Sequence, residues 1–93
     1  MVVGRAELDL LLPSCFSLKD KRQILRSLLE RLRNRFNLAA AEVGNQEQWR
    51  RATIGVACVS NDPAHVRDIL DQVLRFIECD GRCEIARASV EVC

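Results

Sequence analysis

The chain has 93 residues, of which 48% are hydrophobic and 29% are charged, and its formal net charge is +1. This length and balance favour one small domain, residues 1–93, around a single core, and they argue against disorder and against a second domain. Apolar runs such as Leu10–Leu12 are far shorter than the roughly 20 residues of a membrane helix, and no signal-peptide pattern opens the chain. We therefore expect a cytoplasmic protein with no membrane partner.

The first strand and the first helix follow from periodicity. Residues 3–12 alternate between apolar and polar side chains, which predicts a half-buried strand. Ser17 can cap a helix that begins at Leu18 and ends near Arg35, and Asp20 can complete a variant of the capping box. Leucines recur along this helix at steps of three and four residues, so it has one apolar stripe that must cover a sheet.

Two more strands and a second helix are expected next. The strands are 37–43 and 51–60, and a loop that starts with glycine joins them. The pair Asp62 and Pro63 predicts the N-cap and the first residue of a second helix, which ends around Cys79.

A last strand is expected between Cys83 and Val92, after a turn at Gly81. Its apolar residues change phase, which a bulge or a frayed start would explain. The order is therefore β-α-β-β-α-β, the pattern of an α+β ferredoxin-like fold with a four-stranded antiparallel sheet. Both helices should cover one face and leave the other open to solvent or to a partner, and the fold alone does not decide the function.

Positive charge is concentrated in the first helix and in the segment after it. Residues 19–51 contain nine basic and four acidic residues, whereas residues 52–93 contain four basic and seven acidic ones. On a helical wheel, four cations of the first helix form a basic stripe beside the apolar face, while Arg31 and Arg35 lie on the opposite flank. The basic stripe consists of Lys19, Arg22, Arg26 and Arg33.

The basic stripe has two interpretations, a solvated helix face or a contact for the phosphates of a nucleic acid. The polarised charge favours the second. Trp49, Arg50 and Arg51 lie together before the third strand, where they could stack a base and clamp a phosphate, although Trp49 could instead cover the edge of the core. The first and third strands have no aromatic residue for base stacking on the sheet. Small side chains on one face of the second and third strands would permit close packing of a second subunit, as in a homodimer; they are Asn37, Ala39, Ala41, Gly55 and Ala57.

Lys21 points toward the apolar side of the first helix, away from the basic stripe. It either passes the sheet edge with its stem packed or meets a group at the end of the sheet. Glu42 lies on a strand of otherwise small or apolar residues and could face Lys21 or Arg51. We therefore hypothesise a buried ion pair between Lys21 and Glu42 at the sheet end.

No catalytic constellation is present, so we expect no catalytic residues and a non-enzymatic protein. The chain has no nucleophile elbow, no phosphate-binding loop and no H-E-x-x-H motif, and His65 lies at an unshielded position near the start of the second helix. The cysteine count is odd and no C-x-x-C spacing occurs, which predicts reduced thiols. Cys79, Cys83 and His65 are one ligand short of a zinc site, so no metal and no other cofactor is expected.

Several motifs occur in a specific order along the chain: S-L-K-D-K-R at 17–22, W-R-R-A-T-I-G at 49–55 and S-N-D at 60–62. In these motifs the sequence resembles the bacterial YlxP-like family, domain of unknown function 503, over nearly its whole length. The resemblance implies a ferredoxin-like domain of uncharacterised activity, often encoded beside translation initiation and ribosome maturation factors. The chain departs from the family pattern after Cys79, and the resemblance implies no role for Cys83 or Cys93.

The resulting prediction is a non-enzymatic binding module for ribosomal or other structured RNA, with no small-molecule substrate. The alternative is a self-associating module that forms a homodimer through its open sheet and does not bind nucleic acid.

Overall fold

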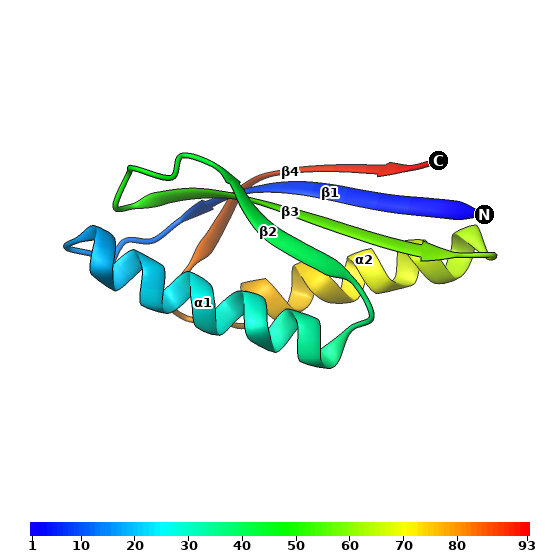
Figure 1. The fold of residues 1–93 in the computed structure, drawn as a ribbon, viewed down its shortest axis with the longest axis horizontal. Helices are drawn as coiled ribbons and strands as arrows, with labels where there is room; N and C mark the ends of the chain where they lie inside the picture. The colour runs from blue at the N-terminus through cyan, green and yellow to red at the C-terminus, as the bar shows by residue number, and fades with distance from the viewer.

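The fold is α+β and ferredoxin-like, with one antiparallel sheet and two helices on the same face of it, as the computed structural model shows for Met1–Cys93 (Figure 1). The strand order is β2-β3-β1-β4, so β1 and β3 are central and β2 and β4 form the edges. The elements are β1 (Val2–Leu11), α1 (Leu18–Arg35), β2 (Ala39–Gly44), β3 (Arg51–Ser60), α2 (Pro63–Glu78) and β4 (Glu84–Val92). This order confirms the one predicted from the sequence.

The two helices begin where their caps predict. The Ser17 hydroxyl accepts a hydrogen bond from the N–H of Asp20 at 3.1 Å. The Asp20 carboxylate in turn accepts one from the N–H of Phe16 at 3.2 Å, one residue earlier than in the usual capping box. At α2, Asp62 accepts from the N–H of Ala64 at 3.0 Å. Each cap satisfies N–H groups that the first helical turn leaves without a partner.

The irregular phase of β4 has its cause in a bulge. The pairing of β4 with β1 shifts beside Leu10 and skips Ala86, so the side chains on either side of it change face. The turn before β4 does not use a left-handed glycine, because no glycine in the chain has a positive φ. Asp80 holds that turn instead, by accepting a hydrogen bond from the N–H of Arg82 at 3.0 Å.

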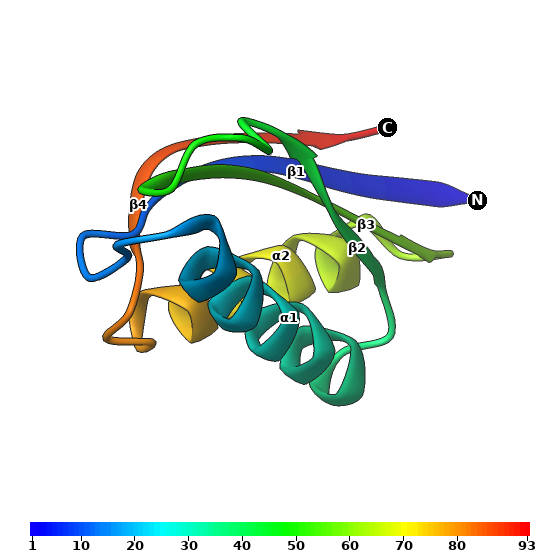
Figure 2. The same cartoon turned by 60° about the vertical axis from the view of Figure 1, so that its left-hand side comes forward.

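The core lies between the sheet and the helices. It is built from the inward-facing residues of β1 and β3 and from the apolar stripes of both helices. α1 packs beneath β2, whereas α2 packs beneath β1, β3 and β4 (Figure 2). One side of α1 therefore runs along the β2 edge of the sheet and the other side faces α2. Neither helix combines the length and apolar character that crossing a membrane would require.

Candidate nucleic-acid interface

The basic stripe lies on the side of α1 that follows the β2 edge. Arg33 fixes this orientation, because its Nη2 donates a hydrogen bond to the carbonyl oxygen of Ala40 in β2 at 2.5 Å. All four members of the stripe are exposed. None of the four forms an ion pair with a carboxylate, and only the Arg33 side chain has a hydrogen-bond partner. The β2-edge flank of α1 therefore presents cations that form no ion pair with an acid. The three free cations are Lys19, Arg22 and Arg26.

The opposite flank of α1 carries cations that are already bound. The Asp80 side chain, 5% exposed, accepts hydrogen bonds from Arg82 Nη2 at 2.8 Å and from Arg31 Nη2. Hydrogen bonds from Arg82, reinforced by Arg31, hold the pKa of Asp80 well below its usual range against the opposing effect of burial. The guanidinium groups of Arg31 and Arg35 also lie over the Phe76 ring, 5.5 and 5.6 Å from its centroid. These contacts dock α1 against α2 and the α2–β4 turn, and we call Asp80, Arg82 and Arg31 the Asp80 cluster.

Lys21 belongs to neither flank. Its side chain is 1% exposed, and its Nζ lies 2.9 Å from Glu42 Oε2 and donates to the carbonyl oxygen of Asn45 at 2.5 Å. Asn45 adopts a left-handed conformation with φ of 56°, which asparagine tolerates better than most residues. Its side chain donates to Thr53, whose hydroxyl donates to Asp9 at 2.8 Å. The network ties the start of α1 to the β2–β3 loop, and Lys21 is too buried to contact a phosphate.

The β2–β3 loop brings further candidate residues to the start of α1. Arg50 Nε donates to the carbonyl oxygen of Cys15 at 3.2 Å, and its guanidinium lies 5.5 Å from the centroid of the Phe16 ring. Trp49 is 51% exposed and is not one of the buried core residues. Arg51 is exposed at the first position of β3. We call Phe16, Trp49 and Arg50 the aromatic corner.

Sequence reasoning missed Phe16, which is 68% exposed. Its position between the end of β1 and the cap of α1 was a usable signal. An aromatic residue there belongs to neither the strand nor the helix periodicity, and therefore has no assigned place in the core.

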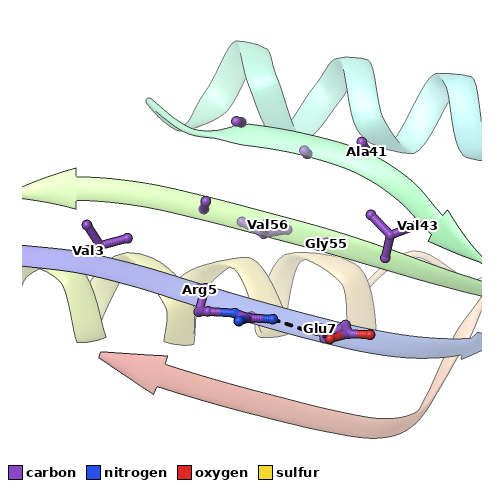
Figure 3. Close-up of a pocket in the computed structure, with 11 residues that line it drawn as sticks. Val3, Arg5, Glu7, Ala41, Val43, Gly55 and Val56 are labelled. Carbon is purple, nitrogen blue, oxygen red and sulfur yellow. Dashed lines mark hydrogen bonds and ion pairs between the residues drawn. The ribbon is translucent and has the colours of Figure 1, made fainter. Parts of the chain in front are cut away.

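The sheet face away from the helices is hollowed over β1, β2 and β3 (Figure 3). The hollow measures about 510 Å³ and is floored by small residues such as Ala41 and Gly55, with Val43 at one side. Arg5 and Glu7 of β1 form an ion pair of 3.5 Å at its other side. This face therefore combines an apolar area with charges of both signs, unlike the β2-edge flank of α1.

The cysteines and the histidine form no chemical site. All five thiols are free, and no group of three or more His, Cys, Asp or Glu side chains is placed to hold a metal ion. Burial raises the pKa of the Cys83 thiol to about 11, so this thiol is protonated and unreactive at neutral pH. His65 is exposed at the start of α2.

Comparison with known proteins identifies the family of the chain. The model of the family described as Protein of unknown function (DUF503) matches residues 3–90. The chain is also 36% identical over 77 residues to Uncharacterized protein YlxP of Bacillus subtilis (strain 168), an alignment that covers 83% of this chain and 84% of that protein. The chain therefore belongs to the DUF503 family.

Proposed function

We propose that the protein is a non-enzymatic RNA-binding module that contacts phosphates of ribosomal or other structured RNA in the cytoplasm. The observation that carries this proposal is the set of exposed cations on the β2-edge flank of α1 that have no acidic partner. Such cations release condensed counterions when they neutralise phosphates, which favours binding without sequence readout. Arg50 adds positive charge beside the start of α1, and Arg51 adds it at the first position of β3, on the strand parity of the open sheet face.

The contrast between surfaces supports this location. On the α2 flank, Asp80 already engages Arg31 and Arg82, and a polyanion would have to compete with a buried carboxylate for them. On the open sheet face, Arg5 is paired with Glu7. A phosphate backbone therefore finds its most favourable potential along the basic stripe.

The test is RNA binding across a salt series with two matched variants. In one, Lys19, Arg22 and Arg26 become glutamine; in the other, three exposed arginines of α2 and β4 become glutamine. The first variant should bind RNA more weakly and show a shallower salt slope, by about 0.7–0.9 for each phosphate that is no longer neutralised. The second should keep the slope near wild type. Absence of wild-type binding at low salt would overturn the proposal. The control residues are Arg67, Arg75 and Arg87.

A second candidate function, self-association through the open sheet face, is favoured by the hollow and its small side chains. Two sheets could pack closely there, with Arg5 of one copy near Glu7 of the other across a two-fold axis. Strand spacing and rise give a face of roughly 600 Å² per copy, near the lower end for a stable dimer. Light scattering should then report twice the monomer mass for the wild type and the monomer mass for Ala41→Arg. A monomeric wild type at high concentration rules this candidate out.

A further inference from the structure

The aromatic residues of this chain divide into two pairs with different surroundings. Phe36 and Phe76 pack edge to face, with 6.0 Å between ring centroids, and lie against the core. Phe16 and Trp49 stay 68% and 51% exposed near the start of α1. Exposed aromatic rings contribute little to the core and are accessible to a partner.

Two residues of the aromatic corner, Phe16 and Arg50, are held in place before any partner arrives. The backbone of Phe16 is fixed by its hydrogen bond to the Asp20 carboxylate at 3.2 Å. Arg50 is fixed by its bond to the Cys15 carbonyl, and its guanidinium lies over the Phe16 ring. The Arg50 guanidinium and the Phe16 ring thus lie close together before binding, so less conformational entropy is lost when a partner arrives.

The chemistry of the corner fits a nucleobase. Bases stack on aromatic rings and on arginine guanidinium planes. Lys19 and Arg22, in the first turns of α1, can hold the flanking phosphates. In a duplex the faces of the bases are covered by their neighbours in the stack, so only an unpaired base can use the corner.

We infer that the aromatic corner stacks an unpaired nucleobase, which makes single-stranded or looped RNA the preferred class of ligand over duplex RNA. This inference rests on the proposed RNA-binding function and adds recognition of bases to contact with phosphates.

The experiment uses the tryptophan of the corner as its reporter. The chain has one tryptophan and no tyrosine, so its fluorescence reports on Trp49 alone. The probes are an oligoadenylate of about 12 nucleotides, the same strand paired with oligouridylate, and inorganic polyphosphate of similar charge. We expect the single strand to quench Trp49 and to bind about tenfold more tightly than the duplex, and polyphosphate to bind without quenching.

Variants of Phe16 separate stacking from charge. Phe16→Ala should weaken binding of the single strand about tenfold and leave binding of polyphosphate unchanged. Phe16→Tyr keeps a stacking ring and should retain affinity for the single strand. The matched control is Val90→Ala, which shortens an apolar side chain of 44% exposure on β4, at the sheet edge away from β2, and should change nothing. Because Phe16 is exposed, its removal leaves the core intact.

The possible failures of the two proposals differ. Equal affinity for single strand and duplex, with no effect of Phe16→Ala, overturns base stacking and leaves phosphate binding standing. Absence of binding to all probes at low salt overturns both proposals.

Discussion

The two flanks of α1 carry the same kind of side chain and differ in what those side chains contact. On the α2 flank, Arg31 forms an ion pair with Asp80 and lies over the Phe76 ring. On the β2-edge flank, Lys19, Arg22 and Arg26 extend into solvent without an acidic partner. The comparison shows that the number of cations on a helix does not identify a binding surface. The location of the compensating acids determines which of those cations are free.

Arg33 shows that the division between the flanks is not absolute. It is exposed and belongs to the basic stripe, yet one of its N–H groups is committed to the Ala40 carbonyl on the β2 edge. This bond occupies a free acceptor of an edge strand, which helps to prevent unwanted strand pairing. Arg33 therefore has a structural contact in addition to any contact with RNA.

The largest expected effect on stability comes from Lys21, which lies between the two flanks. Lys21→Met leaves Glu42 without its counter-charge and the Asn45 carbonyl without its donor. We expect a loss of about 3 kcal/mol in the free energy of unfolding, measured by urea denaturation. Adding Glu42→Gln should recover part of the loss, because the uncompensated charge is then gone. A Lys21→Met variant as stable as wild type would contradict a structural role for the pair.

Asp80→Asn should have the next largest effect, because it releases both arginines of the α2 flank. Charge-assisted hydrogen bonds to the nearly buried Asp80 are removed, at a cost of about 2 kcal/mol in unfolding free energy. Arg31 and Arg82 are exposed enough to regain water, which limits the loss. If this variant is as stable as wild type, the hydrogen bonds between Asp80 and its arginines do not stabilise the fold.

The pH dependence of the unfolding free energy should reveal the contribution of Asp80 when wild type and Asp80→Asn are compared. The pKa of Asp80 is lowered by its arginine partners, so its contribution is complete above the unfolded value of about 4 and is lost as pH falls toward the folded pKa. The difference in unfolding free energy between wild type and Asp80→Asn should therefore be constant near neutral pH and shrink below about pH 4. A difference that stays constant down to about pH 3 would contradict this assignment.

On the β2-edge flank, removal of the cations should affect RNA binding and leave the stability nearly unchanged. Replacement of Lys19, Arg22 and Arg26 by glutamine removes no ion pair and should change the free energy of unfolding by less than about 0.5 kcal/mol. The same change should strongly reduce RNA affinity. Stability loss comparable to that of Asp80→Asn would mean that these cations have structural partners after all.

The smallest effect is expected from Glu30, the one acidic residue of α1 outside its first turn. It is exposed and forms no ion pair, so its charge reduces the positive potential of the helix without holding it in place. Glu30→Gln should raise RNA affinity about twofold at low salt and lose that gain at high salt, as measured by fluorescence anisotropy. Lower affinity in this variant would contradict a purely electrostatic contact.

Local patterns were sufficient to predict the elements and the helix caps, because periodicity and capping depend on residues within one or two turns. The orientation of Lys21 was predictable for the same reason, since a charge at an apolar wheel position needs a partner. The partner of Arg31 was not predictable, because Asp80 approaches it from a turn 49 residues away. The exposure of Trp49 likewise depends on how the loops meet, which no local pattern specifies, whereas the position of Phe16 outside both periodicities was a local signal.

The central claim is that the β2-edge flank of α1 is a phosphate-binding surface. Its most direct test is the salt dependence of binding to a structured ribosomal RNA fragment, measured for wild type and for the variant with all four residues of the basic stripe changed to glutamine. The account predicts a steep decrease of wild-type affinity with salt and a slope shallower by about three in the variant. Equal slopes for the two proteins, or no binding by wild type at low salt, would contradict it.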